Sequence, residues 1–408
     1  MEPLTSEQIE PAPIAVPEID LDDLRRRLVA TRWPDCETVP DGRQGAPLAA
    51  VQALCRYWEH DYDWRRCETM INGWGPARTE IDGLGIHFLH IRSPEPDALP
   101  VIMTHGWPGS VVEFHQVIGP LTDPRAHGSD PADALHLVLP SLPGYGWSDQ
   151  PTATGWNLAC IAQAWTVLMQ RLGYENRWAA QGGDWGAQVT SVLAGQAPPG
   201  CIGIHLNSHA WSPNNAERAS ADVWERDLLK RMARFQREMI GYSTQQGTRP
   251  QTLGYGLSDS PAGQAAWIYE KYCEWTDHDG DPTSLLGCDA MLDNIMFYWL
   301  PDASASAARL YWEVAHSEPE LEPVDLPVAF SQSPRDIGGP SRRWAERRFP
   351  NIVHWNLVAR GGHFAAFEQP EIFVDEVRTG FRAIRAAGSG AADPHVGDGP
   401  PLNLCRHV

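Results

Sequence analysis

The sequence predicts an α/β protein with a mostly parallel central sheet, helices on both faces of that sheet, and a helical cap. Short apolar runs alternate with helical stretches over residues 96–212. A helix-rich stretch follows over residues 213–318, and the pattern of apolar runs returns over residues 319–383. We therefore expect one sheet built from two chain segments, with the cap inserted between them.

The ends of the chain differ in composition from its middle. Residues 1–12 are acidic and contain prolines, and we expect a flexible lead there. Residues 13–95 are expected to form an N-terminal extension that packs outside the main sheet and supports the cap. Residues 384–408, in which Ser, Gly, Asp and Pro are prominent from Gly388 onward, predict a disordered tail.

Four short runs are candidate strands, and a polar or glycine-rich segment follows each of them. They are Leu99–Met103, Arg177–Gln181, Leu326–Ser331 and Ile352–Val358. Two stretches predict helices. One begins at Ala187, and the clearest amphipathic one runs from Arg218 to Met239.

The pentapeptide Gly182–Gly186, with the sequence GGDWG, has the spacing of a nucleophile elbow. Asp184 stands where a serine is usual, so this carboxylate would attack the substrate. Glycines two positions before and after it allow the sharp turn that the motif needs. A predicted strand ends just before the turn, and a predicted helix begins just after it. The alternative is an ordinary Gly-rich loop or a helix cap, which the pentapeptide alone does not exclude.

The segment His105–Gly109, with the sequence HGWPG, follows the predicted strand Leu99–Met103. In the α/β-hydrolase arrangement, one backbone N–H from this loop and one from the residue after the nucleophile form an oxyanion hole. Here those donors would be Trp107 and Trp185. A simple turn is the alternative for HGWPG, but its place ahead of the elbow suits the order of that fold.

The order of residues along the chain indicates which histidine and which acid are the candidate catalytic pair. His363 follows the predicted strand Ile352–Val358 on a glycine loop, and the order nucleophile, acid, histidine is the one expected of this fold. Asp336, just beyond the strand Leu326–Ser331, is the candidate acid. Otherwise Asp336 would be a solvated loop carboxylate that caps a helix starting near Pro340. Four other acids compete for its role: Glu322, Asp325, Asp289 and Asp293.

With these residues in view, the chain resembles an epoxide hydrolase of the microsomal type, within the α/β-hydrolase superfamily, over residues 13–383. Beyond the elbow, the matching stretches are residues 140–148 (PSLPGYGWS), 241–263 and 360–368. Residues 21–28 and 31–35 are similar to the N-terminal domain that separates this type from the shorter soluble one.

The resemblance implies a two-step reaction. Asp184 would open the three-membered ring to give a hydroxyalkyl ester, which an activated water would then hydrolyse. Two cap tyrosines, which fall by motif on Tyr242 and Tyr311, would donate hydrogen bonds to the epoxide oxygen, because a phenol with a pKa of about 10 stays protonated at neutral pH. His363 would take a proton from the water, and Asp336 would orient the imidazole and stabilise its charged form.

Simpler interpretations remain for the other tyrosines and for the function. Tyr255, Tyr269, Tyr272 and Tyr298 are expected to pack in the core with satisfied hydroxyls. A haloalkane dehalogenase shares the Asp elbow and the water-activating histidine, but the cap tyrosines and the N-terminal domain argue against it. A serine esterase is disfavoured because no Gly-x-Ser-x-Gly occurs. A non-catalytic ligand-binding protein of this fold would have lost catalytic groups, whereas all five candidate positions are filled.

Composition predicts a cytoplasmic bacterial enzyme. The 408 residues, 42% of them hydrophobic, suffice for a large core. The net charge of −20 disfavours nucleic acid and anionic membranes as partners. Arginine far outnumbers lysine, which favours a high-GC bacterial origin. The first twenty residues show neither a signal peptide nor a membrane anchor, unlike the microsomal relatives.

No cofactor or metal is expected. The 8 cysteines show no CxxC and no regular spacing, which indicates reduced thiols and no structural metal. No phosphate-binding glycine loop occurs, since the glycines near Asp184 serve the elbow. The partners we expect are a small-molecule epoxide and water, and a homodimer is suggested only by the resemblance.

The abundance of tryptophan predicts a bulky apolar or aromatic epoxide as substrate. Each indole could equally fill core space, and the sequence does not choose between epoxide disposal and natural-product biosynthesis. The tryptophans expected near the cleft are Trp107, Trp156, Trp185, Trp267, Trp299 and Trp312.

Overall fold

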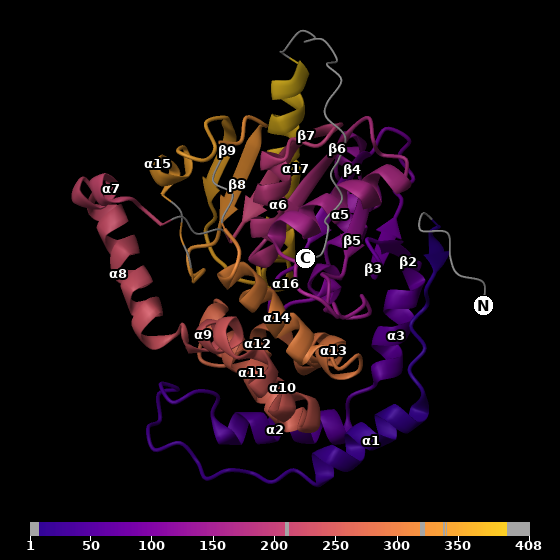
Figure 1. The fold of residues 1–408 in the computed structure, drawn as a ribbon, viewed down its shortest axis with the longest axis vertical. Helices are drawn as coiled ribbons and strands as arrows, with labels where there is room; N and C mark the ends of the chain where they lie inside the picture. The colour runs from indigo at the N-terminus through magenta and orange to yellow at the C-terminus, as the bar shows by residue number, and fades with distance from the viewer. Residues whose placement is uncertain (1–7, 209–211, 319–322, 338, 340, 390–408) are drawn as a thin grey trace.

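A nine-stranded sheet forms the centre of the protein in a computed structural model that describes residues 8–208, 212–318, 323–337, 339 and 341–389 (Figure 1). The strand order is β1-β2-β3-β5-β4-β6-β7-β8-β9, with parallel pairing from β5 through β9 and antiparallel pairing before it. The strands are β1 (Glu10–Pro11), β2 (Pro76–Ile81), β3 (Leu84–Ile91), β4 (Leu99–Thr104), β5 (Leu135–Pro140), β6 (Trp178–Gly182), β7 (Cys201–Asn207), β8 (Val328–Gln332) and β9 (Ile352–Leu357). The predicted fold class is confirmed.

Helices cover both faces of the sheet, as predicted. Gly203 and His205 of β7 lie against side chains of α17 (Pro370–Ser389). The alternate residues Ile204 and Leu206 therefore face the other side. On that side α5 (Leu158–Arg171) and α6 (Trp185–Gly195) pack against each other and against the sheet (Figure 1). Shorter elements complete the core: η1 (Val111–Phe114), α4 (Ile118–Thr122), η2 (Pro131–Asp133), α15 (Arg342–Ala345) and α16 (Ala365–Glu368).

The N-terminal extension contributes strands to the sheet, so the expectation that residues 13–95 pack outside it is wrong for residues 76–91. β2 and β3 form a hairpin whose two turn residues, Asp82 and Gly83, have φ of 50° and 76°. An Asp-Gly pair favours such a turn, and β3 then pairs with β5. Residues 10 and 11, expected in a flexible lead, form the edge strand β1.

The rest of the extension is helical and lies against the cap. It forms α1 (Glu18–Val29), α2 (Leu48–His60) and α3 (Trp64–Gly73). α1 and α2 pass under the cap helices in Figure 1. The cap connects β7 to β8 and consists of α7 (Asn215–Ala219), α8 (Val223–Glu238), α9 (Gly241–Thr248), α10 (Pro250–Asp259), α11 (Pro261–Trp275), α12 (Thr283–Leu286), α13 (Cys288–Trp299) and α14 (Ser304–Ala315).

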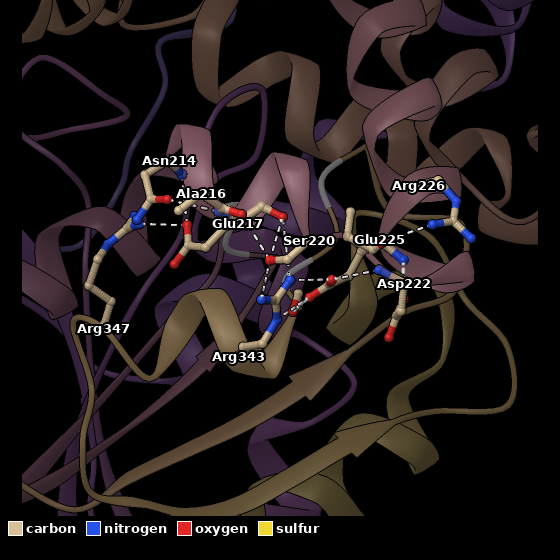
Figure 2. A network of polar contacts seen from close by, with 11 residues as sticks. Asn214, Ala216, Glu217, Ser220, Asp222, Glu225, Arg226, Arg343 and Arg347 are labelled. Carbon is tan, nitrogen blue, oxygen red and sulfur yellow. Dashed lines mark hydrogen bonds and ion pairs between the residues drawn. The ribbon is translucent and has the colours of Figure 1, made fainter.

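The amphipathic stretch Arg218–Met239 is two helices rather than the one predicted. Asn214 caps α7 and Asp222 caps α8, and each accepts a hydrogen bond from the backbone N–H three residues further on. Each of these capping boxes starts a new helix, so the chain turns between them. The glutamates of the two boxes also form ion pairs with arginines of the second sheet segment (Figure 2): Glu217–Arg347 and Glu225–Arg343.

The last helix extends beyond residue 383, where the sequence predicted the ordered part to end. α17 continues to Ser389, so residues 384–389 of the predicted tail are helical, and Ile384 is fully buried against the sheet. The remainder of that tail, residues 390–408, lies outside the described residues. Within the described part of the chain, no helix has the length and apolar character needed to cross a membrane.

Candidate active site

Asp184 lies at the turn between β6 and α6 and has a φ of 53° and a ψ of −123°. A residue with a side chain rarely adopts a positive φ, so close packing must hold this turn. A Cβ on Gly182 would collide with the backbone of Gly186, and a Cβ on Gly186 would collide with the carbonyl group of Thr104. A Cβ on Gly106 would collide with Asp184 itself. These glycines are therefore required by the turn.

The two oxygens of the Asp184 carboxylate have different neighbours. Oδ1 accepts a hydrogen bond of 2.9 Å from the backbone N–H of Trp107. Oδ2 lies 3.4 Å from Nε2 of His363. Trp185 is the first residue of α6, so its backbone N–H belongs to the first turn, where the helix supplies no acceptor of its own. The structure thus brings together Asp184, His363 and the loop of Trp107.

His363 is held on its other side by Asp336. Nδ1 of His363 lies 2.8 Å from Oδ1 of Asp336 and 2.8 Å from Oγ of Ser208. The Asp336 side chain is 1% exposed, and its second oxygen accepts a hydrogen bond of 2.7 Å from Gln332. Asp336 therefore lies where a partner of this histidine has to be.

The competing acids have other neighbours. Asp293 accepts hydrogen bonds from Tyr62 and Arg66, and Asp289 accepts one from Tyr57, so both contact the N-terminal extension. Asp325 is exposed. Glu322 lies outside the described residues.

The charge of His363 follows from its two carboxylate neighbours. Burial alone would lower the pKa of His363, but the hydrogen bonds and charges of Asp184 and Asp336 outweigh it and raise this pKa to about 10. The resting site at neutral pH therefore contains an imidazolium between two carboxylates.

Tyr242 on α9 and Tyr311 on α14 approach the site from the cap, and both are buried. The ring of Tyr242 stacks on Trp107 at 4.9 Å, and the ring of Tyr311 meets Trp185 edge-on at 4.7 Å. The two tyrosine rings are 5.9 Å apart. Burial, followed by the charge of Asp184, raises the pKa of Tyr242. For Tyr311, burial is likewise the first cause of a raised pKa. Both phenols are therefore protonated at neutral pH.

Two further cap residues contact this cluster and were not singled out from the sequence. Trp275 packs on Tyr242 at 5.1 Å and on His363 at 4.9 Å. The Lys271 ammonium lies 4.8 Å from the ring centre of Tyr242, although the side chain is 1% exposed. Its ion pairs with Glu270 and Glu274 compensate its burial. A lysine in an apolar helix of a chain with so few lysines was the available signal for Lys271.

The tryptophans expected near the cleft divide into three groups. Trp107 and Trp185 lie in the aromatic cluster of the site. Trp156 and Trp312 line a separate groove of about 730 Å³ between the cap and the loop 143–156. Trp267 donates to Gln246, and Trp299 lies under Arg27, so these two are held elsewhere in the cap.

The loop that carries His363 is tied to the cap. The Glu368 carboxylate accepts backbone N–H groups of Gly362, Phe364 and Asp277 at 2.8 to 2.9 Å. The backbone N–H of His363 donates to the carbonyl of Trp275 at 2.7 Å. Glu368 occurs in one of the motifs noted above, but the sequence alone did not predict this function of its side chain.

A small cavity adjoins Asp184 on the side of His363. Its volume is about 20 Å³, and Glu113, Asp184, Asn207 and His363 contribute its polar side chains. A cavity of this size holds one water molecule. Glu113 was not predicted from the sequence, although a charged residue inside the apolar run Val111–Phe114 was a signal for it.

Two family profiles match the chain. The family described as "Epoxide hydrolase N terminus" matches residues 9–114, and the family described as "alpha/beta hydrolase fold" matches residues 100–252. The first match covers the N-terminal extension and the HGWPG loop, and the second includes the elbow.

Relatives of similar length carry the same description. The chain is 54% identical to a "Putative epoxide hydrolase" of Stigmatella aurantiaca, over 93% of this chain and 86% of the relative. It is 31% identical to "Epoxide hydrolase 1" of Oryctolagus cuniculus, over 92% and 89%. Among solved structures, the juvenile hormone epoxide hydrolase of Bombyx mori aligns with a TM-score of 0.84 at 30% identity, over 93% of this chain and 96% of that one.

The Aspergillus niger epoxide hydrolase aligns nearly as well, with a TM-score of 0.82 at 31% identity, over 94% of this chain and 97% of that one. These matches extend over both sheet segments, the cap and the N-terminal extension, so they concern the whole architecture. The resemblance first noted in the sequence is confirmed: the chain belongs to the epoxide hydrolases of the α/β-hydrolase fold, and it is an epoxide hydrolase enzyme.

Proposed function

We propose that this enzyme converts an epoxide to a vicinal diol through an ester of Asp184, which a water activated by His363 then hydrolyses. The arrangement of the two Asp184 oxygens carries the proposal. Oδ1 is held by the backbone N–H of Trp107 at 2.9 Å, and Oδ2 lies on the side of His363 at 3.4 Å. The first oxygen suits the position of a later oxyanion, and the second is the nucleophile.

In the first step, Oδ2 of Asp184 attacks a ring carbon, and the bond from that carbon to the epoxide oxygen breaks. The oxygen gains negative charge as the bond breaks, so hydrogen-bond donors facing it lower the barrier. Tyr242 and Tyr311 supply two such donors, because burial keeps both phenols protonated. A carboxylate needs no base for this attack.

The protons balance within the site. Ring opening turns the Asp184 carboxylate into a neutral ester and leaves one negative charge on the new alkoxide. The proton of the His363 imidazolium neutralises that alkoxide by way of the phenols. Loss of the Asp184 charge also removes one of the two influences that raise the pKa of His363. His363 is therefore neutral when the second step needs a base.

In the second step, His363 takes a proton from water as the water oxygen attacks the Asp184 ester carbon. The tetrahedral oxyanion forms on Oδ1, where Trp107 N–H already donates, and Trp185 N–H is the second donor that we propose. Collapse breaks the bond from the ester carbon to the diol oxygen. The leaving diol oxygen takes the second proton of the attacking water, so Asp184 is again a carboxylate, and Asp336 stabilises the imidazolium that remains.

We further propose a bulky apolar or aryl epoxide as the substrate. The rings of Trp107 and Trp275 pack against each other and against Tyr242, and Trp107 also contacts Tyr311. An apolar substituent of the substrate would therefore contact aromatic rings beside the two phenols. The cytoplasmic location, the bacterial origin, the homodimer and a role in detoxification or natural-product biosynthesis stay predictions.

A single-turnover experiment with styrene oxide in heavy-oxygen water tests the covalent step. Enzyme in excess should give a first diol whose new oxygen comes from Asp184, so this diol should lack the solvent label. Label in the diol of the first turnover would mean that water attacks the epoxide directly, and would reject the proposal.

The variant His363→Gln isolates the intermediate. It should still open the ring but stop at the ester, so the protein mass should rise by the mass of the substrate. Asp184→Ala should give neither adduct nor diol. Sustained turnover by His363→Gln would contradict the assignment of His363 as the base.

A further inference from the structure

The second step requires one water molecule beside the Asp184 carbon, and the structure has a cavity of that size there. This inference rests on the proposed function. The polar side chains that line this cavity of about 20 Å³ are those of Asp184, His363, Glu113 and Asn207. Its remaining lining is glycine and apolar: Gly106, Trp107, Gly109, Phe114, Gly183, Phe364, Ala365, Ala366 and Phe373. Among the residues that the structure describes, a water molecule in this cavity can therefore form side-chain hydrogen bonds only with these four polar residues.

Glu113 is the acceptor that the proposed mechanism does not use. It lies on η1, which begins after Ser110 and follows directly on the HGWPG loop. A Cβ on Gly109 would lie 2.7 Å from its Oε2, so the carboxyl group lies against the glycine that ends that loop. The backbone N–H of Gly106 lies near enough to this carboxyl group to lower its pKa slightly. These contacts fix the carboxyl group beside the cavity.

Asn207 is already engaged. Its Oδ1 accepts a hydrogen bond of 2.6 Å from Gln181, and a Cβ on Gly183 would lie 2.7 Å from its Nδ2. One of the two lone pairs of this amide oxygen is therefore already used. Glu113 is therefore the better acceptor for a proton of the water.

We propose that Glu113 is a further catalytic residue, which orients the hydrolytic water by accepting a hydrogen bond from one of its protons while Nε2 of His363 takes the other. The water oxygen then points a lone pair at the Asp184 ester carbon. Glu113 itself takes no proton in this step, so the balance of the reaction is unchanged.

The charges of the site favour these two roles, in which Glu113 accepts a hydrogen bond from the water and His363 takes its proton. Burial first, and then the neighbouring Asp184 charge, raise the pKa of Glu113 to about 8, whereas His363 lowers it. In the resting enzyme a neutral Glu113 avoids a second negative charge beside the nucleophile. A neutral carboxyl group still has a carbonyl oxygen that accepts a hydrogen bond, so Glu113 can hold the water without taking its proton.

The test separates the two steps in the full-length enzyme. Glu113→Met keeps the size of the side chain but removes both oxygens, and Glu113→Gln keeps one acceptor oxygen. With styrene oxide as the probe, rapid quench and intact-protein mass give the rates at which the ester forms and disappears. Glu113→Met should slow ester disappearance about 100-fold, because a misplaced reactant costs about that much. Ester formation should stay within about threefold of the wild-type rate, since the Trp107 loop does not change.

Each outcome decides the proposal. Glu113→Gln should lie between Glu113→Met and the wild type, and Glu80→Gln, an exposed position on β2, is the matched control that should behave as the wild type. Ester hydrolysis at the wild-type rate in Glu113→Met would overturn the role of Glu113. An equal loss in both steps would also overturn it, because it would mean that Glu113 only shapes the loop. If the wild type forms no ester, the covalent mechanism fails, and the role of Glu113 fails with it.

Discussion

The imidazole of His363 faces a carboxylate at each nitrogen, Asp184 at Nε2 and Asp336 at Nδ1. Removing either charge should therefore lower the pKa of His363 from about 10. For Asp336→Asn we expect a fall of about one to three units, the usual effect of an opposite charge at hydrogen-bond distance. Nitrogen-15 NMR of the histidine ring across pH measures it. Asp325→Asn, at an exposed position before β8, is the control, and an unchanged midpoint in Asp336→Asn would contradict the assignment.

The phenols of Tyr242 and Tyr311 serve ring opening alone in the proposed mechanism, so their loss should be specific to one step. Tyr242→Phe and Tyr311→Phe should each slow ester formation about 100-fold, as the loss of one oxyanion donor usually does. Hydrolysis of an ester already formed should change little. Single-turnover rates of both steps check this, with Tyr255→Phe as the control, because Tyr255 is 73% exposed. Equal losses in both steps would indicate a packing role.

The candidate site was predictable where chain order carries information. Asp184, Asp336 and His363 follow predicted strands, so their order along the chain identified them before any contact was known. Trp275 and Glu113 reach the site through the packing of α11 and η1, which no local pattern encodes. The same reason explains the error at Tyr255, which was expected in the core although its position on α10 faces solvent.

At the scale of elements, four strands of the parallel part, β4, β6, β8 and β9, were predicted within two residues, whereas β5 and β7 were not singled out. The apolar runs of β4, β6 and β8 are buried on both faces, which leaves a continuous signal in the sequence. The β2–β3 hairpin was missed although its sequence contains both a turn signal, Asp82-Gly83, and the apolar stretch Leu84–Ile91. The break between α7 and α8 was missed because the apolar period continues across the capping residues.

The attachment of α8 depends on a buried carboxylate. The Glu225 side chain is 4% exposed and accepts a hydrogen bond from Arg343 (Figure 2). It also accepts one from Ser341. The Arg343 guanidinium is the largest cause that lowers the pKa of Glu225 to about 2. Because this pKa is depressed, the stability it contributes is present above the unfolded value of about 4.5 and is lost as pH falls through about 2.

Arg343→Met should therefore loosen α8 at neutral pH, where the contribution of the ion pair is complete. Leaving the Glu225 carboxylate without this partner should cost about 1–3 kcal/mol. Hydrogen exchange of the α8 amides should accelerate about tenfold or more, while the strands of the sheet stay protected. Arg342→Met is the matched control, because its partner Glu346 is half exposed. Equal exchange in the two variants would contradict the role of Arg343.

At the scale of the whole molecule, the N-terminal extension, the cap and the HGWPG loop form one continuous set of contacts through α13. Arg66 pairs with the buried Asp293 at 2.7 Å. On the same helix, Asn294 donates to the carbonyl of Pro108, and Tyr298 donates to the carbonyl of Gly109. The extension thus contacts the helix that positions the oxyanion loop, which is a physical reason for a domain that carries no predicted catalytic residue.

The stability of the molecule should depend on pH through histidines that the fold keeps neutral. Burial lowers the pKa of His87, His90 and His105 to about 4, and that of His205 to about 3. In the unfolded chain the same side chains bind protons near pH 6.5. As pH falls from 6.5 to 4, these histidines therefore bind protons in the unfolded state but stay largely neutral in the folded state. Each histidine lowers stability by up to about 1.4 kcal/mol per pH unit in that range.

Acids whose pKa burial raises act in the opposite direction, namely Glu113, Glu368, Glu274 and Asp293. The histidines outnumber them, because burial also lowers the pKa of His115 and His136. The pKa of Glu113 is raised to about 8 and that of Glu368 to about 7, with burial the first cause for each, so the folded state takes up two protons before the unfolded state does. The net result should be a loss of stability between pH 6.5 and 4.5. Urea unfolding at one-unit pH steps measures it, and His205→Gln should reduce the slope by about 1.4 kcal/mol per pH unit, because it removes one of these histidines. A stability that rises across this range, or a slope that His205→Gln leaves unchanged, would contradict the neutral state of these histidines.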